Sequence, residues 1–236
     1  MRNDLVMEFN DEGYLIYSDS FPGAFVRGRT RDEALSKFPQ EIKKYCKWAG
    51  IHITNYNLED KIVQEKKSSL RIFDADSDVI FETEKEPLSE GEYIRLKLLG
   101  IKSAQDFLCM YESIPNKDIT SLDERKTFYG AIPRTAKEMY EHTNNVTSYY
   151  VGEINIALNN ISNIANNRKN AFKAIESMDG YLANPVYRGS YGEEWSLRKV
   201  LRRFIWHDRI HAKAMYRMAI RLWDKETITD PFFFGT

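Results

Sequence analysis

The chain has 236 residues, of which 42% are hydrophobic and 13% aromatic, and its formal net charge is −1. This amount of apolar material excludes wholesale disorder, and the length fits one large domain or two small ones. The near-neutral charge provides no broad electrostatic surface for nucleic acid or for a membrane, so we expect neither as a partner.

Cysteine content and the start of the chain bear on location. The two cysteines, Cys46 and Cys109, are too few for a disulfide scaffold or a cysteine-rich zinc site. The first residues, MRNDLVMEFNDEGYLIY, contain acids and no long apolar run, so they are not typical of a signal peptide. No window approaches the 18 or so apolar residues of a transmembrane helix. These features predict a cytoplasmic protein.

The first part of the chain has short apolar runs typical of an α+β domain. Two strands, Leu5 to Phe9 and Tyr14 to Tyr17, are predicted around a turn that ends at Gly13, and a third strand over Ala24 to Gly28. Thr30 and Glu33 form a capping-box pattern that predicts a helix from about Arg31 to Ala49. Three further runs are predicted as strands: Ile51 to Asn55, Ser69 to Phe73 and Val79 to Glu82.

The second part has long runs with helical spacing of apolar residues, typical of a four-helix bundle. The change of pattern near Pro87 predicts a boundary within residues 83–88, with an α/β sandwich-like domain over 1–84 and an all-α domain over 85–236. The predicted helices of the second domain are Glu90–Ser113, Thr135–Asn160, Asn163–Ser177 and Ser196–Trp223.

Three of the four histidines fall on predicted helices of the second part. His207 and His211 lie four residues apart, so they share one helix face and can bind one divalent ion. Helix bundles build such sites in their interior, and a third ligand is expected from a facing helix. His142 meets that condition, whereas His52 falls in the other part. The alternative is a pair of surface or capped histidines, because this spacing is common by chance.

Residues 207–211 read HDRIH, close to the HExxH motif of zinc metalloproteases. Asp208 would then replace the glutamate base, and its side chain is one methylene shorter. A protease also needs a strand edge beside this helix to hold its substrate, and the second part has no predicted strand. A metalloprotease therefore ranks below other metal-dependent functions.

A stripe of four basic residues precedes the histidine pair on the last predicted helix. One interpretation is a solvated face with ion pairs to another helix, which we favour. The other is a basic wall near the metal that binds a carboxylate or a thiol cofactor, with Arg202 and Arg203 as candidate ligand-binding residues. Trp195, Trp206 and Trp223 are interpreted as core or interface anchors. The stripe consists of Arg198, Lys199, Arg202 and Arg203.

The second part, over residues 88–225, resembles the DinB/YfiT-like superfamily of metal-binding four-helix bundles. The resemblance lies in segments 135–154 and 194–217, which include WSLRKVLRR followed by HDRIH. In that family one histidine comes from the second helix and an HxxxH pair from the last, matching His142, His207 and His211. The resemblance implies a divalent metal, zinc or nickel, with positions open to water. It also implies thiol-dependent S-transfer or isomerisation with a low-molecular-weight thiol in some members, and a homodimer.

The first part resembles HicB-like antitoxin domains over residues 14–49. Matching features are a Pro-Gly turn between strands, a Gly-x-Thr sequence and a helix that begins with Glu-Ala-Leu. Antitoxins of this type usually add a small DNA-binding module, and a helical bundle follows here instead. The resemblance therefore implies a ligand-sensing or interaction module rather than a repressor.

Three functions follow from these observations. The first is a metal-dependent enzyme, a thiol-dependent S-transferase or a metal-assisted hydrolase, acting on a small thiol or electrophile. Asp208 and Glu141 are its candidate catalytic residues because they neighbour the ligands. The second is a non-catalytic sensor or interaction protein of toxin–antitoxin type. The third is a dimer scaffold in which the histidines are structural.

Overall fold

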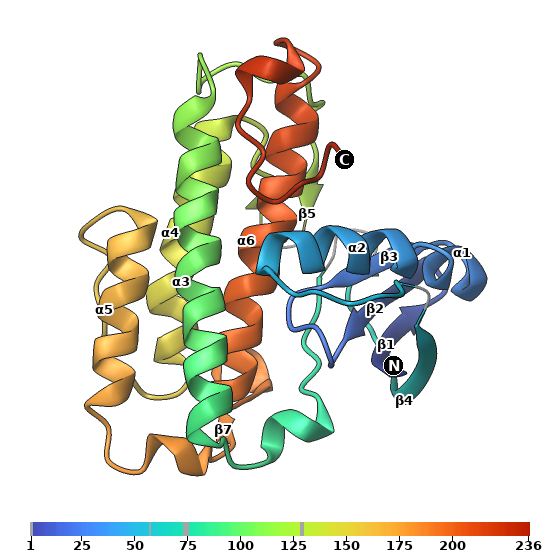
Figure 1. The fold of residues 1–236 in the computed structure, drawn as a ribbon. Coiled ribbons are helices and arrows are strands. Elements are labelled where there is room, and N and C mark those ends of the chain that lie inside the picture. Colours follow the sequence, from blue (N-terminus) through green and yellow to red (C-terminus); the bar gives the residue numbers. More distant parts are fainter. Residues whose placement is uncertain (1, 57, 73–75, 128–129) are drawn as a thin grey trace.

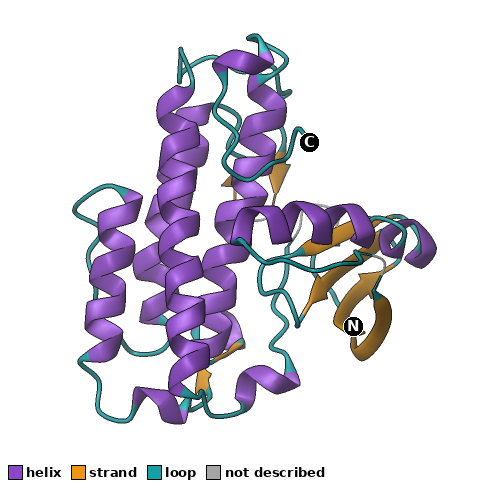
Figure 2. Cartoon of the chain, viewed as in Figure 1, coloured by secondary structure: helices purple, strands orange, loops and turns teal. Residues whose placement is uncertain are grey.

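Two parts of the chain lie side by side in the computed structural model, a four-stranded sheet with two helices and a region of four helices (Figure 1, Figure 2). The structure describes residues 2–56, 58–72, 76–127 and 130–236. The predicted α+β class is therefore confirmed. Among the described residues no helix combines the length and the apolar character needed to cross a membrane.

The sheet is mixed and has the strand order β3-β2-β1-β4. Strands β1, β2 and β3 are antiparallel neighbours, and Asn10 pairs with Gly13 at the first hairpin, as the turn pattern predicted. Strand β4 runs parallel to β1 on its other side. The strands are β1 (Arg2–Asn10), β2 (Gly13–Ser18), β3 (Phe25–Gly28) and β4 (Glu59–Lys67).

Strand β4 was not predicted, because its sequence EDKIVQEKK is mostly charged. Its side chains are exposed or half-buried along the whole strand, as expected at a sheet edge, so the apolar alternation is weak. Backbone pairing with β1 defines the strand. The strand predicted over Ile51–Asn55 is wrong. Residues 69–72 form no strand either, and Phe73 lies outside the described residues.

The strand predicted over Val79–Glu82 is also wrong, although Val79 and Phe81 are buried. Side chains, rather than a neighbouring strand, satisfy the backbone carbonyls here. Arg202 Nη2 donates to the Val79 carbonyl at 3.1 Å, and Gln64 Nε2 donates to the Ile80 carbonyl at 2.9 Å. Buried carbonyls need a partner but not a strand, and apolar periodicity does not reveal which one they have.

The single helix predicted over residues 31–49 is two helices, α1 (Arg31–Leu35) and α2 (Phe38–Ala49). The predicted cap at Thr30 is present, and its side chain accepts a hydrogen bond from the Glu33 amide. Pro39 lies in the first turn of α2, where its missing N–H leaves no backbone bond unmade. A continuous helix would place that proline in its interior, so the chain begins a new helix instead.

Helices α3 to α6 pack together and form the second part. The predicted boundaries agree closely except in α4, which ends at Gly152, and the chain turns through Asn155 at φ +65°. The helices are α3 (Glu90–Ser113), α4 (Ala136–Gly152), α5 (Ile164–Glu176) and α6 (Leu197–Ala219). The remaining short elements are η2 (Glu82–Lys85), β5 (Lys126–Thr127), β6 (Gly130–Ala131), η3 (Tyr181–Ala183), β7 (Tyr187–Arg188), η4 (Ser190–Gly192), β8 (Glu194–Trp195) and η5 (Lys225–Thr227).

Side chains on both faces of β1 and β2 are buried, and α6 contributes to the apolar cluster on each face. On one face Leu5 and Met7 belong to an apolar cluster that includes α2 and the interior of the helical region. On the other face Val6 and Tyr17 pack in a second cluster with Trp206 of α6. One continuous core therefore extends across the predicted boundary at residues 83–88.

The two parts approach each other closely at Gly23, which lies at φ +95° against Ile205 of α6. A Cβ at this position would clash with the Ile205 side chain, and the backbone conformation disfavours any L side chain.

We expect Gly23→Ala to lower the free energy of unfolding by about 2 kcal/mol or more, measured by urea denaturation. Gly91→Ala is the control, because a Cβ there meets nothing within 4 Å. Equal stability of the two variants would contradict this account.

Candidate metal centre

Helix α6 carries two of the three histidines. Ser196 caps the helix by accepting a hydrogen bond from the Lys199 amide at 3.1 Å. The helix then continues without interruption to Ala219, and most of its side chains are buried because it packs against both parts of the chain. His207 and His211 are one turn apart on this helix, with ring centroids 4.4 Å apart.

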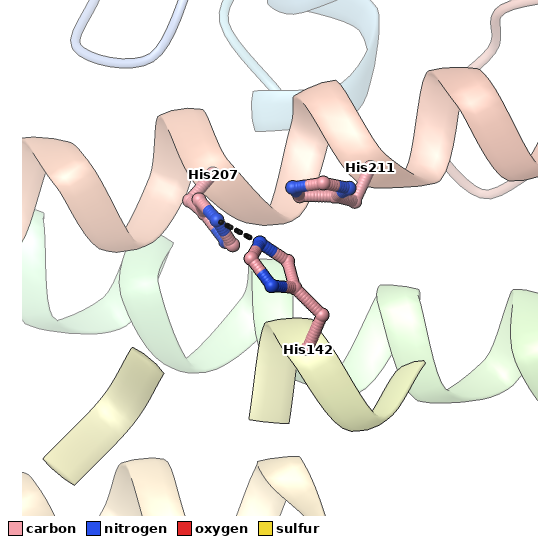
Figure 3. Close-up of side chains that lie close together, drawn as sticks. All are labelled: His142, His207 and His211. Carbon is pink, nitrogen blue, oxygen red and sulfur yellow. Dashed lines mark hydrogen bonds between the residues drawn. The ribbon is translucent and has the colours of Figure 1, made fainter. Parts of the chain in front are cut away.

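His142 approaches the pair from α4, so the three imidazoles converge (Figure 3). Its ring centroid lies 5.0 Å from that of His207 and 4.7 Å from that of His211. The Nε2 atoms of His142 and His207 are 3.2 Å apart, and one ring nitrogen from each histidine lies within 4.8 Å of the others. Nitrogens that share an ion at about 2.0–2.1 Å lie about 3.3 Å apart, so small side-chain adjustments suffice for a shared ion.

The surroundings of the cluster keep its imidazoles neutral. Desolvation lowers the pKa of His142. Desolvation and the nearby His142 together lower the pKa of His211 to about 3. Burial, and then the neighbouring His211 and His142, hold the pKa of His207 well below its ordinary value. Only a neutral imidazole has a lone pair for a metal, so all three can act as ligands at neutral pH.

The cluster opens onto a cleft of about 1430 Å³ between the sheet and the helical region. His142, His207 and His211 all line it, with His142 exposed, His211 half-buried and His207 buried. The sheet side of the cleft includes Phe25 and Val26 of β3. A small molecule in this cleft can therefore reach the histidines from the side that the protein leaves open.

The donor set consists of imidazoles among the residues that the structure describes. Imidazole suits zinc, nickel, copper and iron, whereas magnesium and calcium prefer oxygen ligands. The Nδ1 atom of His207 is buried and has no hydrogen-bond partner in the described parts of the chain. Three neutral nitrogens with room beside them fit a divalent ion that keeps open positions.

Asp208 does not lie with the histidines. Its two carboxylate oxygens accept hydrogen bonds from Arg168 of α5, each at 3.0 Å, and Ser103 of α3 also donates to it. Asp208 and Arg168 are both fully buried, and the Arg168 guanidinium stacks 3.8 Å from the Phe204 ring centroid. This carboxylate is therefore committed to an ion pair that joins α5 and α6, rather than to a bound molecule.

The other candidate catalytic residue, Glu141, is exposed on α4. It follows Tyr140 and is near enough to Tyr111 to contribute to the raised pKa of that phenol. It is not among the described residues that line the cleft. The structure therefore brings together the three histidines but neither of the two acids next to them in sequence.

The basic stripe at the start of α6 is an internal face rather than a solvated one. Lys199 is 0% exposed and donates to the Asp78 and Glu194 carbonyls, and Arg202 is 3% exposed and pairs with Glu84. Arg198 is half-buried and donates to the Thr83 carbonyl. The expected ion pairs thus exist, and they join Arg202 to Glu84 of η2, Arg198 to Glu92 of α3 and Lys199 to Glu193. Arg203 is different, since it lines the cleft.

Several residues of the cleft were not recognised from the sequence. Tyr149 and Tyr150 follow His142 on α4, and Glu193 precedes the cap of α6. The interpretation of Trp206 as an interface anchor agrees with its burial between α6 and the sheet. The sequence around His142 did contain a signal for the two tyrosines. Tyr149 and Tyr150 lie two helical turns beyond His142 on α4, so they lie on the same side of the helix. No pattern in the first part indicated that the sheet faces this site.

Comparison with known proteins does not extend these observations. The chain matches no family model, no curated protein and no solved structure. The features established by the structure are a mixed sheet with helices, a helical region and a three-histidine cluster that can hold a metal. The resemblances to DinB/YfiT-like and HicB-like proteins stay predictions from sequence motifs.

The ion pair between Arg168 and Asp208 supports the helix that carries two histidines. Arg168→Met leaves the Asp208 carboxylate buried without its cation, which typically costs about 3–5 kcal/mol. We expect a loss of this size in the free energy of unfolding, measured by urea denaturation. Lys97→Met is the control, because it breaks the more exposed pair between Lys97 of α3 and Glu176 of α5, and costs about 1 kcal/mol or less. Similar losses in the two variants would refute the structural role of the buried pair.

Proposed function

We propose that the protein binds one divalent metal ion, zinc or nickel, through His142, His207 and His211. The observation that supports this proposal is the convergence of three neutral imidazoles from two helices at the edge of a large cleft. A purely structural role for the histidines would not require a cleft in front of them. The motif resemblance to DinB/YfiT-like proteins points in the same direction.

The proposed activity is metal-assisted chemistry on a small molecule, either thiol-dependent S-transfer or hydrolysis. A divalent ion held by neutral ligands supplies a Lewis acid that lowers the pKa of a coordinated water or thiol. The histidines hold the ion, and the buried position of His207 fixes one ligand within the packed helix. Because Asp208 is bound to Arg168, a proton acceptor must come from the cleft or from the substrate.

The first part of the chain has a role in this proposal as a wall of the cleft. Phe25 and Val26 of β3 line it opposite the helices, together with Gly28. A ligand-sensing role, as the HicB-like resemblance implies, is consistent with this position. We therefore propose that the sheet shapes the binding of the small molecule rather than acting on a separate partner.

Metal content tests the ligand assignment directly. Untagged protein after extensive dialysis is expected to retain about one divalent ion per chain by elemental analysis. His142→Ala removes an exposed ligand, so the fold should persist while metal is lost. His52→Ala is the matched control, since His52 is exposed in the first part of the chain and should retain metal. Stoichiometric metal in the H142A and H207A variants would overturn the assignment.

Metal should also stabilise the fold, because the three ligands converge only in the folded chain. Zinc added to the metal-free protein at about 100 times its dissociation constant is expected to raise the free energy of unfolding by about 2.7 kcal/mol. Thermal denaturation with and without zinc measures this shift. His142→Ala should abolish most of it, and an unchanged zinc response in that variant would count against the site.

A further inference from the structure

Arg203 is a buried cation that forms no ion pair among the residues that the structure describes. Its side chain is 8% exposed, and its Nε and Nη1 atoms have no hydrogen-bond partner among the residues that the structure describes. Burial of a charge is unfavourable unless the charge is paired and hydrogen-bonded. The protein therefore keeps at this position a buried guanidinium whose Nε and Nη1 donors are unused among the described residues.

The other buried cations of α6 show what a structural role looks like. Arg202 pairs with Glu84, Arg209 pairs with Glu41 at 2.7 Å, and Lys199 reaches Glu193 at 3.4 Å. Each of them contacts a carboxylate from another element or from the loop before α6. Arg203 lies among aromatic rings as these cations do, 4.8 Å from the centroid of Trp206, 5.5 Å from Tyr150 and 5.6 Å from Trp195. It differs from them because no carboxylate pairs with it among the residues that the structure describes.

The acids nearest to Arg203 are engaged elsewhere. Glu193 and Glu8 are close enough to influence its charge, but neither forms an ion pair with it among the described contacts. Glu193 pairs with Lys199. Glu8 accepts hydrogen bonds from Ser77 and Tyr17, and burial raises its pKa, which weakens it as a counter-ion.

The position of Arg203 on α6 relates it to the histidines. Arg203, His207 and His211 follow one another at intervals of four residues, so they share one face of the helix, about 5–6 Å apart along it. All three line the same cleft. A molecule of a few bonds' length therefore spans the distance from the guanidinium to the histidine cluster.

We propose that the cleft binds a small molecule with one carboxylate, which pairs with Arg203, and an apolar body that lies against Tyr150 and Trp206. This inference rests on the proposed metal site for the position of the reacting end of the molecule, which faces the histidines. A single guanidinium among aromatic rings suits a monoanion with an apolar portion. A phosphate normally needs more donors than this one group supplies.

The test uses the zinc-loaded full chain and two probes, 3-mercaptopropionate and its neutral methyl ester, with affinities from isothermal titration calorimetry. The acid is expected to bind at least about tenfold more tightly than the ester. In Arg203→Met this preference should disappear, through weaker binding of the acid alone. Arg217→Met is the matched control, because it removes the same charge from an exposed position on the same cleft, and the preference should remain.

A second measurement does not depend on whether R203M folds. The Nε–H NMR signal of Arg203, assigned by its absence from R203K, should shift on addition of the acid and stay in place with the ester. A signal that the acid leaves unmoved, equal affinities for acid and ester, or displacement of the acid by a lower concentration of inorganic phosphate would overturn the carboxylate site. Zinc content is determined separately, so loss of zinc from the wild type marks failure of the metal site instead.

Discussion

The burial of most of α6 is the constraint on which the arrangement of the molecule depends. A buried charge needs a counter-charge at contact distance, and α6 contains several such charges. Arg202 binds Glu84 of η2, Arg209 binds Glu41 of α2, and Asp208 binds Arg168 of α5. The partner residue in each pair comes from a different element, so the three pairs together fix the positions of the sheet part and of α5 relative to α6. Apolar packing stabilises this arrangement, whereas the charge pairs select one orientation.

The same constraint explains where the cleft lies. The sheet docks on α6 through Trp206, and α4 packs against another side of the helix. The space between these two contacts is the cleft, and the histidine face of α6 looks into it. The second part alone would contain the three ligands but would lack the opposite wall. The site is therefore a product of both parts of the chain, although its proposed metal ligands come from one.

Local signals in the sequence predicted the elements whose boundaries depend on local chemistry. The capping pattern at Thr30 predicted the start of α1, the apolar spacing predicted α3, and the spacing of His207 and His211 identified two members of the cluster. Strand β4 and the segment at Val79 depend on partners far away in sequence, so local patterns could not define them. Asp208 adjoins His207 in sequence, but successive helical residues point about 100° apart. That rotation separates the carboxylate from the cleft.

The position of residues around α6 also has an evolutionary consequence. One turn of α6 holds 3.6 residues, so an insertion or deletion of one residue between Trp206, which contacts the sheet, and His207 would rotate both histidines by about 100° relative to that contact. Such a change would turn the histidines away from the cleft if the sheet contact were kept, or detach the sheet if the histidines were kept. Substitutions can alter this helix one side chain at a time, but its length between these residues cannot drift. The spacing of residues along α6 thus fixes the orientation of the histidine cluster relative to the docked sheet, and the two features must be conserved together.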